Sequence, residues 1–101
     1  METTVLEKDG KLIATFVGEM DTTAALEAEK LLQPLYKSAG KDVIIECKEL
    51  EYIASSGLRI LLNILKGAKA GGSRVVMSHV NDDIKNVFKL TGFIDLFEFE
   101  D

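Results

Sequence analysis

Residues 42–65 read DVIIECKELEYIASSGLRILLNIL, a strand signal and a helix signal joined by a short junction. The run at residues 43–45 is apolar and rich in β-branched side chains, which is typical of a strand buried on both faces. Four leucines then follow at the i, i+3, i+4, i+7 spacing of one helix face: Leu58, Leu61, Leu62 and Leu65. The stretch therefore predicts a buried strand that leads into an amphipathic helix.

The junction Ala54-Ser55-Ser56-Gly57 places two hydroxyls and a glycine where that helix begins. A helix start leaves backbone N–H groups unpaired, and a serine side chain can accept from one of them as an N-cap. The same N–H groups and the positive end of the helix dipole also favour a phosphate. The residues alone thus predict either a capped helix or a serine in a setting that accepts an anion.

Composition limits the classes of function. The chain has 101 residues, enough for one domain with a modest core. Its 12 Lys and Arg against 17 Asp and Glu give a formal net charge of -5, which argues against direct binding of nucleic acid or anionic membrane. No apolar run is long enough to span a bilayer or resembles a signal peptide, so we expect a cytoplasmic protein.

Two residue types argue against metal and enzyme chemistry. Cys47 is the only cysteine and His79 the only histidine, so neither a disulfide nor a soft-ligand metal cluster is predicted. Cys47 is interpreted as a small core residue. A catalytic triad and a glycine-rich phosphate loop are both missing from the pattern, so we expect no cofactor and no enzymatic activity.

The amino-terminal third predicts a hairpin followed by a broken helix. Asp9-Gly10 favours a tight turn between strands at residues 5–8 and 11–17. A helix capped within residues 21–23 should run to Gly40, with a kink or break near Gln33 because Pro34 cannot donate its helical hydrogen bond.

The remainder predicts alternating strands and helices. After the strand at residues 42–47 come a polar connection at 48–52, a helix at 56–70 and a strand at 74–78. A third helix begins at residues 81–83 and ends at Thr91-Gly92, and a last strand covers 94–99. The expected apolar positions of this third helix are Ile84, Val87, Phe88 and Leu90.

The resulting order is β-β-α-β-α-β-α-β in one domain, residues 1–101. Alternation of strands with crossover helices predicts an α/β fold with a mixed sheet of four to five strands. The opening hairpin gives an antiparallel pair, the other strands are largely parallel, and three main helices pack on the sheet.

Three motifs resemble one family. Residues 52–62, YIASSGLRILL, are similar to the signature loop and helix start of STAS domains, named for sulphate transporters and anti-sigma-factor antagonists. Residues 18–21, GEMD, resemble the family's Gly-x-Leu-Asp, and residues 90–97, LTGFIDLF, resemble its late Leu-x-Gly-Leu stretch. The three motifs occur in the family's order and span essentially the whole chain.

The resemblance implies a phosphorylation switch. In stand-alone bacterial members, a serine kinase that is also an anti-sigma factor phosphorylates the serine before the glycine, and a serine phosphatase reverses this. By position Ser56 matches the phosphoacceptor, while Ala54 departs from the family's usual Asp. The partner-binding surface that the resemblance implies contains Asp21, Ser55, Ser56, Gly57, Leu58 and Arg59.

Several alternatives stay open at this point. Asp21 is also a good helix cap, Arg59 is interpreted as a solvated side chain or a phosphate contact, and Ile60 and Ile64 could be either core or an exposed docking patch. The leading functional hypothesis is an anti-sigma-factor antagonist that regulates transcription. Its alternatives are a constitutive scaffold subunit of a membrane transporter complex and a small-ligand or nucleotide-binding module.

Overall fold

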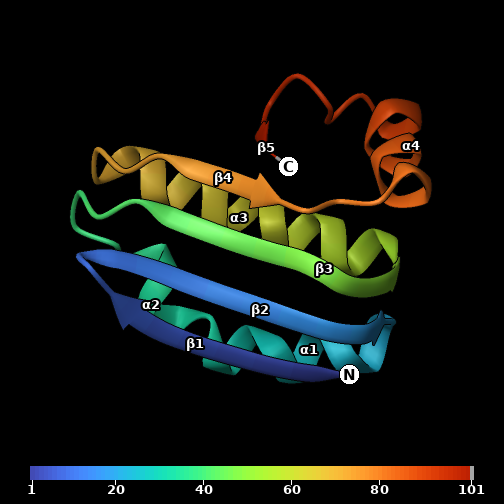
Figure 1. Cartoon of the computed structure of the whole chain (residues 1–101), viewed down its shortest axis with the longest axis horizontal. Coiled ribbons are helices and arrows are strands. Elements are labelled where there is room, and N and C mark those ends of the chain that lie inside the picture. The colour runs from blue at the N-terminus through green and yellow to red at the C-terminus, as the bar shows by residue number, and fades with distance from the viewer. Residues whose placement is uncertain (101) are drawn as a thin grey trace.

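The computed structural model describes residues 1–100 and confirms the α/β fold with five strands in the order β1-β2-β3-β4-β5 (Figure 1). The β1–β2 pair is antiparallel and each later pair is parallel. The strands are β1 (Glu2–Lys8), β2 (Lys11–Met20), β3 (Val43–Ile53), β4 (Val75–Ser78) and β5 (Glu98–Glu100). The helices are α1 (Thr22–Leu31), α2 (Gln33–Tyr36), α3 (Ser55–Ala70) and α4 (Asp82–Thr91).

The two strongest local predictions are confirmed. Asp9 and Gly10 form the hairpin turn with φ angles of 53° and 76°, and Lys8 pairs with Lys11. The first helix breaks where Pro34 cannot donate: α1 ends at Leu31 and the short helix α2 begins at Gln33.

The prediction of a polar connection at residues 48–52 is wrong, because β3 continues to Ile53. β2 also runs further than expected and pairs with this segment, from Val17 opposite Glu49 to Met20 opposite Ile53. Two register shifts accompany the extension, one of them next to Gly18 with its φ of 106°. Polar residues can occupy this part of β3 because Lys48, Glu49 and Glu51 are exposed, while Leu50 and Ile53 fill the buried positions.

The carboxy-terminal region also differs from expectation. Residues 94–97 form turns, and β5 is limited to Glu98–Glu100 because β4 offers only residues 76–78 for pairing. Leu90 does not join the apolar face of α4; its side chain is 79% exposed. It lies six residues after Ile84, outside the i, i+3, i+4 stripe that Ile84 forms with Val87 and Phe88.

The core lies on one side of the sheet. Helices α1, α2 and α3 cover that face, while α4 lies beside the end of β4 (Figure 1). Phe88 of α4 packs edge-on against Phe97 and Phe99, with ring centroids 5.4 and 5.5 Å apart. Ile60 and Ile64 belong to this core, which excludes an exposed patch at these positions.

The interior accounts for the lone cysteine. Cys47 is fully buried on β3, as predicted. Burial, reinforced by the nearby Glu46 carboxylate, raises the pKa of its thiol to about 12. A thiol held neutral in the core is a poor nucleophile.

Candidate functional site at the amino end of helix α3

Two helices begin side by side at one edge of the sheet. Strands β2 and β3 are parallel, so their carboxyl ends, Met20 and Ile53, lie next to each other. The Ala54 N–H donates to the Met20 carbonyl at 2.8 Å and ties the two strand ends together. The first turns of α1 and α3 follow directly, and the Ser56 hydroxyl donates a long hydrogen bond of 3.4 Å to the Thr22 hydroxyl.

Of the two alternatives that the sequence left open for this junction, the structure excludes a serine that caps α3. The N-cap residue is Ala54, in an extended conformation, and no side chain accepts a hydrogen bond from the first turn. Ser55 and Ser56 are instead the first two helical residues. The N–H groups of this turn therefore have no capping side chain, which leaves them available to an anion.

Gly57 explains how closely α3 approaches the strand ends. It is buried, and a Cβ added there would lie 2.6 Å from the Met20 sulfur and 2.9 Å from Cγ1 of Ile53. Both distances are shorter than side-chain contacts allow, so a larger residue would force the Met20 and Ile53 side chains to repack. Glycine at this position thus lets the first turn of α3 pack closely against the Met20 and Ile53 side chains.

Asp21 acts as a helix cap in this structure. Its carboxylate accepts from the Ala24 N–H at 2.8 Å, at the start of α1. Because that carboxylate is exposed, the cap leaves it accessible from solvent beside the start of α3.

A groove of about 250 Å³ opens next to the site, between α3 and the segment after α4. Leu58 and Leu62 provide apolar walls, and the exposed Arg59 contributes a positive charge. Its lining residues are Ser55, Leu58, Arg59, Leu62, Thr91 and Phe93. The groove joins the amino end of α3 to the end of α4, two segments far apart in the sequence.

The structure brings together all of the site residues that the sequence predicted, but it separates them by exposure. Ser55, Arg59 and Asp21 are exposed and Ser56 is half-buried, whereas Gly57 and Leu58 are buried. Sequence reasoning missed Thr22, which contacts Ser56, and also Thr91 and Phe93 in the groove. Thr22 directly follows the motif at residues 18–21, and Thr91 and Phe93 lie within the motif at residues 90–97, which was the available sequence signal.

A second polar cluster surrounds His79 at the end of β4. Its Nδ1 lies 2.8 and 2.9 Å from the two carboxylate oxygens of Glu46, and 3.1 Å from the Ser78 hydroxyl. All three contacts use the same ring nitrogen, so this arrangement does not relay a proton from the serine to the carboxylate. Among residues 1–100, no group of three acidic, histidine or cysteine side chains is placed to hold a metal ion.

The fold and the paired helix starts define a small α/β domain with a serine in the first turn of its longest helix. The sequence model of the STAS domain family matches residues 2–101, so the chain belongs to that family. In the part of the chain that the structure describes, no helix is long and apolar enough to cross a membrane.

Similar proteins have been named as anti-sigma factor antagonists. BtrV of Bordetella bronchiseptica, named as a candidate antagonist of this kind, is 28% identical over 97 residues, which are 96% of this chain and 84% of BtrV. An anti-sigma-B factor antagonist of Staphylococcus aureus is 28% identical over 79 residues, 78% of this chain and 73% of that protein.

The fold is also found in solved structures. A candidate anti-sigma factor antagonist from Thermotoga maritima superposes with a TM-score of 0.86 at 22% identity, covering 98% of this chain and 86% of its own. The Bacillus cell fate determinant SpoIIAA, solved in its phosphorylated form, superposes with a TM-score of 0.74 at 17% identity. The match covers 99% of this chain and 92% of the SpoIIAA chain. At these identities the likeness concerns the fold.

Proposed function

We propose that this protein is an anti-sigma factor antagonist that binds its partner over the amino end of α3 and loses the partner when Ser56 is phosphorylated. The observation that carries the proposal is the position of Ser56, half-buried in the uncapped first turn of that helix. The names of the similar proteins support the general role. On this proposal residues 1–101 act as one cytoplasmic, non-enzymatic binding domain.

Electrostatics gives the switch its direction. A phosphoserine carries about -1.5 to -2 charges at pH 7. At the start of α3 these charges meet N–H groups that no side chain caps, so the domain stays folded. A partner packed over Ser56 would bury the same charge without a counter-ion, which costs several kcal/mol of binding free energy.

The other site residues take different parts. Ser55 and Arg59 are exposed and contact the partner, and the Asp21 carboxylate contributes to the same surface while it caps α1. Gly57 and Leu58 are buried and act by holding the surface in place. The partner is an anti-sigma factor with serine kinase activity, and a serine phosphatase reverses the modification.

Intact-mass analysis tests the switch. The protein and its Ser56→Ala variant are incubated with ATP and lysate of the source cell, in which kinase activity is verified with a second substrate. One added phosphate on the wild type, and none on the variant, supports the proposal. An unmodified wild type in an active lysate, or a phosphate that persists on Ser56→Ala, contradicts it.

Two other measurements separate the alternatives. A constitutive scaffold of a membrane transporter would use this surface without modification and would co-purify with an integral membrane protein. A small-ligand module would use the groove beside Ser55, and nucleotides or other ligands added to the pure protein would then raise its melting temperature.

A further inference from the structure

The first turns of α1 and α3 bring two hydroxyl groups together. The Ser56 hydroxyl donates toward the Thr22 hydroxyl, with 3.4 Å between the two oxygens. A strong hydrogen bond between hydroxyls is shorter, roughly 2.5–3.0 Å. The contact is therefore weak in the unmodified protein. It nevertheless shows that the hydrogen of the Ser56 hydroxyl, which a phosphorus atom would replace, points toward the neighbouring helix.

Phosphorylation would reverse the roles of the two side chains. A hydroxyl both donates and accepts, whereas a phosphate ester that has lost its protons only accepts. Ser56 is the donor in the unmodified protein, so Thr22 uses its oxygen and keeps its own hydrogen free to donate. A bond from this hydroxyl to a phosphate oxygen would be charge-assisted, and such bonds are roughly twice as strong as neutral ones. A weak contact would thus become a strong one.

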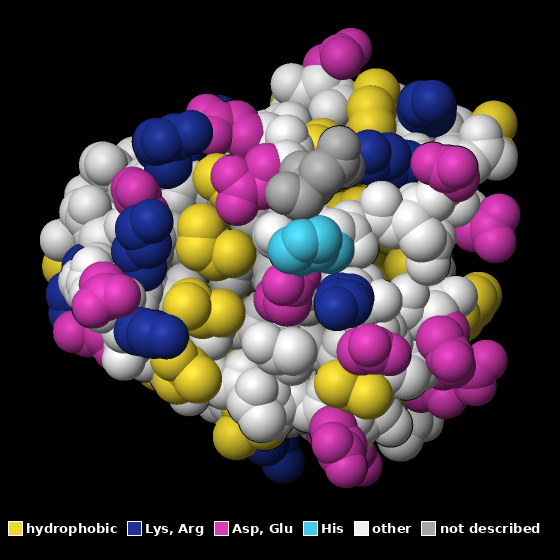
Figure 2. Space-filling view, viewed as in Figure 1, with side chains coloured by type: hydrophobic (Ala, Val, Ile, Leu, Met, Phe, Trp, Pro, Cys, Tyr) yellow, Lys and Arg dark blue, Asp and Glu magenta, His cyan; other side chains and the backbone are white. Residues whose placement is uncertain are grey.

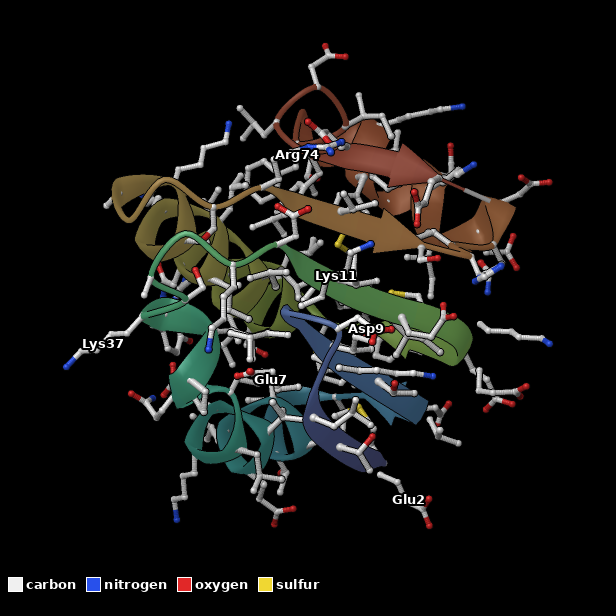
Figure 3. The ribbon with its side chains drawn as sticks, turned by 60° about the vertical axis from the view of Figure 1, so that its left-hand side comes forward. Glu2, Glu7, Asp9, Lys11, Lys37 and Arg74 are labelled. Atoms are coloured by element: carbon white, nitrogen blue, oxygen red, sulfur yellow. The ribbon has the colours of Figure 1, made fainter. Side chains whose placement is uncertain are left out.

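The charges at this end of the molecule make local donors important. Several acidic side chains appear at the right-hand end of Figure 2, where β2 and β3 end. The exposed acidic residues in or next to these strand ends are Glu19, Asp21, Glu49 and Glu51. Figure 3 looks toward the opposite end, with basic side chains labelled at Lys11, Lys37 and Arg74. Charges at that distance are screened by salt, so a phosphate on Ser56 depends on donors within reach.

These donors come from two helices. In α3, the Ala54 and Leu58 N–H groups already donate to the carbonyls of Met20 and Ala54. The N–H groups that no side chain caps are those of residues 55–57, and the exposed Arg59 lies one turn further along the same helix. Thr22 is the donor that α1 supplies. A phosphate that accepts from Thr22 as well as from α3 would bridge the two helices.

We propose that Thr22 is a positioning residue for the phosphate of Ser56, and that its hydroxyl donates to a phosphate oxygen and ties the start of α1 to the start of α3. The inference rests on the proposed function, which supplies the phosphate. Asp21, the residue before Thr22, does not prevent this contact, because its carboxylate is bonded to the Ala24 N–H at 2.8 Å and that bond partly offsets its charge.

A held phosphate makes the switch more complete. Tied to Thr22, it cannot swing into solvent when a partner approaches. It also lies beside the exposed Asp21 carboxylate, which belongs to the proposed partner surface. A partner that packs there has to desolvate two neighbouring anions in place of one.

A thermodynamic cycle tests the inference. Phosphoserine is incorporated at residue 56 during translation, by suppression of a stop codon, and intact mass verifies one phosphate. The melting temperature is measured with and without the phosphate in the wild type and in Thr22→Val. The change on phosphorylation should be more favourable in the wild type by about 2 °C or more, because only the wild type gains the new hydrogen bond. A purely structural role of Thr22 shifts both forms equally and cancels in this difference.

Three matched variants and one spectrum sharpen the cycle. Thr22→Ala also lacks the hydroxyl and should show the same loss as Thr22→Val, whereas Thr22→Ser keeps it and should behave like the wild type. Thr23→Val changes the exposed threonine next in sequence and should have no effect. The phosphorus NMR signal of the phosphoserine should move in Thr22→Val and stay in place in Thr23→Val, since it reports directly on the surroundings of the phosphate.

Several results would overturn the inference. They are an equal change on phosphorylation in the wild type and Thr22→Val, a Thr22→Ser variant that behaves like Thr22→Val, and an equal loss in Thr23→Val. If Arg59→Gln removed the effect of the phosphate while Thr22→Val kept it, the phosphate would lie along α3 and the bridge to α1 would be excluded. The proposed function fails separately, in the lysate experiment, because the cycle needs no kinase.

Discussion

The amino ends of α1 and α4 differ from that of α3 in one respect. Asp21 and Asn81 each accept a hydrogen bond of 2.8 Å from the first turn of their helices, whereas Ala54 offers no side-chain acceptor to α3. Yet α3 has 16 residues, whereas α1 and α4 have 10 each.

Packing explains how α3 tolerates an open end. Seven of its residues are buried, compared with two in α1 and two in α4. Tertiary burial is the main source of helix stability in proteins, so a helix with this much buried surface needs a cap least. The helix start that can be left open is thus the one that carries Ser56.

The largest effect is expected from removing the α4 cap. Asn81→Ala loses the bond to the Ile84 N–H and a second one, at 3.1 Å, from the side-chain amide to the Leu50 carbonyl of β3. We expect the free energy of unfolding to fall by about 2 kcal/mol, measured by urea denaturation. The exposed Asn86→Ala is the control. A loss no greater than that of the control would contradict the comparison.

Removing the α1 cap should cost less. Asp21→Ala loses one exposed hydrogen bond, so we expect a decrease of about 1 kcal/mol in the same measurement. Asp21→Asn keeps a capping oxygen without the charge and should retain most of the stability. If the Asn variant were as unstable as the Ala variant, the carboxylate would act through its charge and not as a cap.

Closing the open end should be stabilising. Ala54→Asp supplies the missing acceptor at the N-cap of α3 and should raise the free energy of unfolding by about 1 kcal/mol. Ala70→Asp puts the same charge at the other end of the helix and should lower it. Since cap and phosphate compete for the same N–H groups, phosphorylation of Ser56 should raise the melting temperature of the wild type more than that of Ala54→Asp. Equal shifts would contradict this competition.

The smallest effect is expected at Ser56 itself. Its hydroxyl makes one long contact with Thr22 and caps nothing, so Ser56→Ala should change the free energy of unfolding by less than about 0.5 kcal/mol. A loss near 1 kcal/mol would show that the serine is structural after all. Ser55→Ala, one residue earlier in the same turn, is the matched control.

Much of the architecture was predictable because its signals are local. Asp9-Gly10 and Gly92 allow positive φ angles and Pro34 removes a hydrogen-bond donor, and the structure has a turn, a left-handed helix end and a helix break at these places. The apolar run before Cys47 and the leucines of α3 likewise lie in the predicted strand and helix. The site residues from Ser55 to Arg59 were predicted because the STAS signature that they resemble is one continuous stretch of sequence.

The differences arise where a residue depends on segments that are distant in sequence. Lys48 and its neighbours read as a polar connection, but β3 continues through them because the end of β2 is available to pair. Ser56 has a good N-cap side chain, but the N-cap position is taken by Ala54, two residues earlier, where its N–H is bonded to the Met20 carbonyl. The propensity of a residue limits the local structures that it can adopt, and the pairing with the neighbouring strand decides which of them forms.

By itself, the sequence determined the order of strands and helices, the turn, the break and the identity of the serine-bearing motif, since each depends on residues close together in the chain. Only the tertiary structure decided that Ala54 leaves α3 open and that Gly57 and Leu58 are buried. It also decided that Leu6, Ile13 and Ile44 lie side by side on the face of the sheet that α1, α2 and α3 do not cover. These features depend on strand register and on which face the helices cover, and no local pattern contains either.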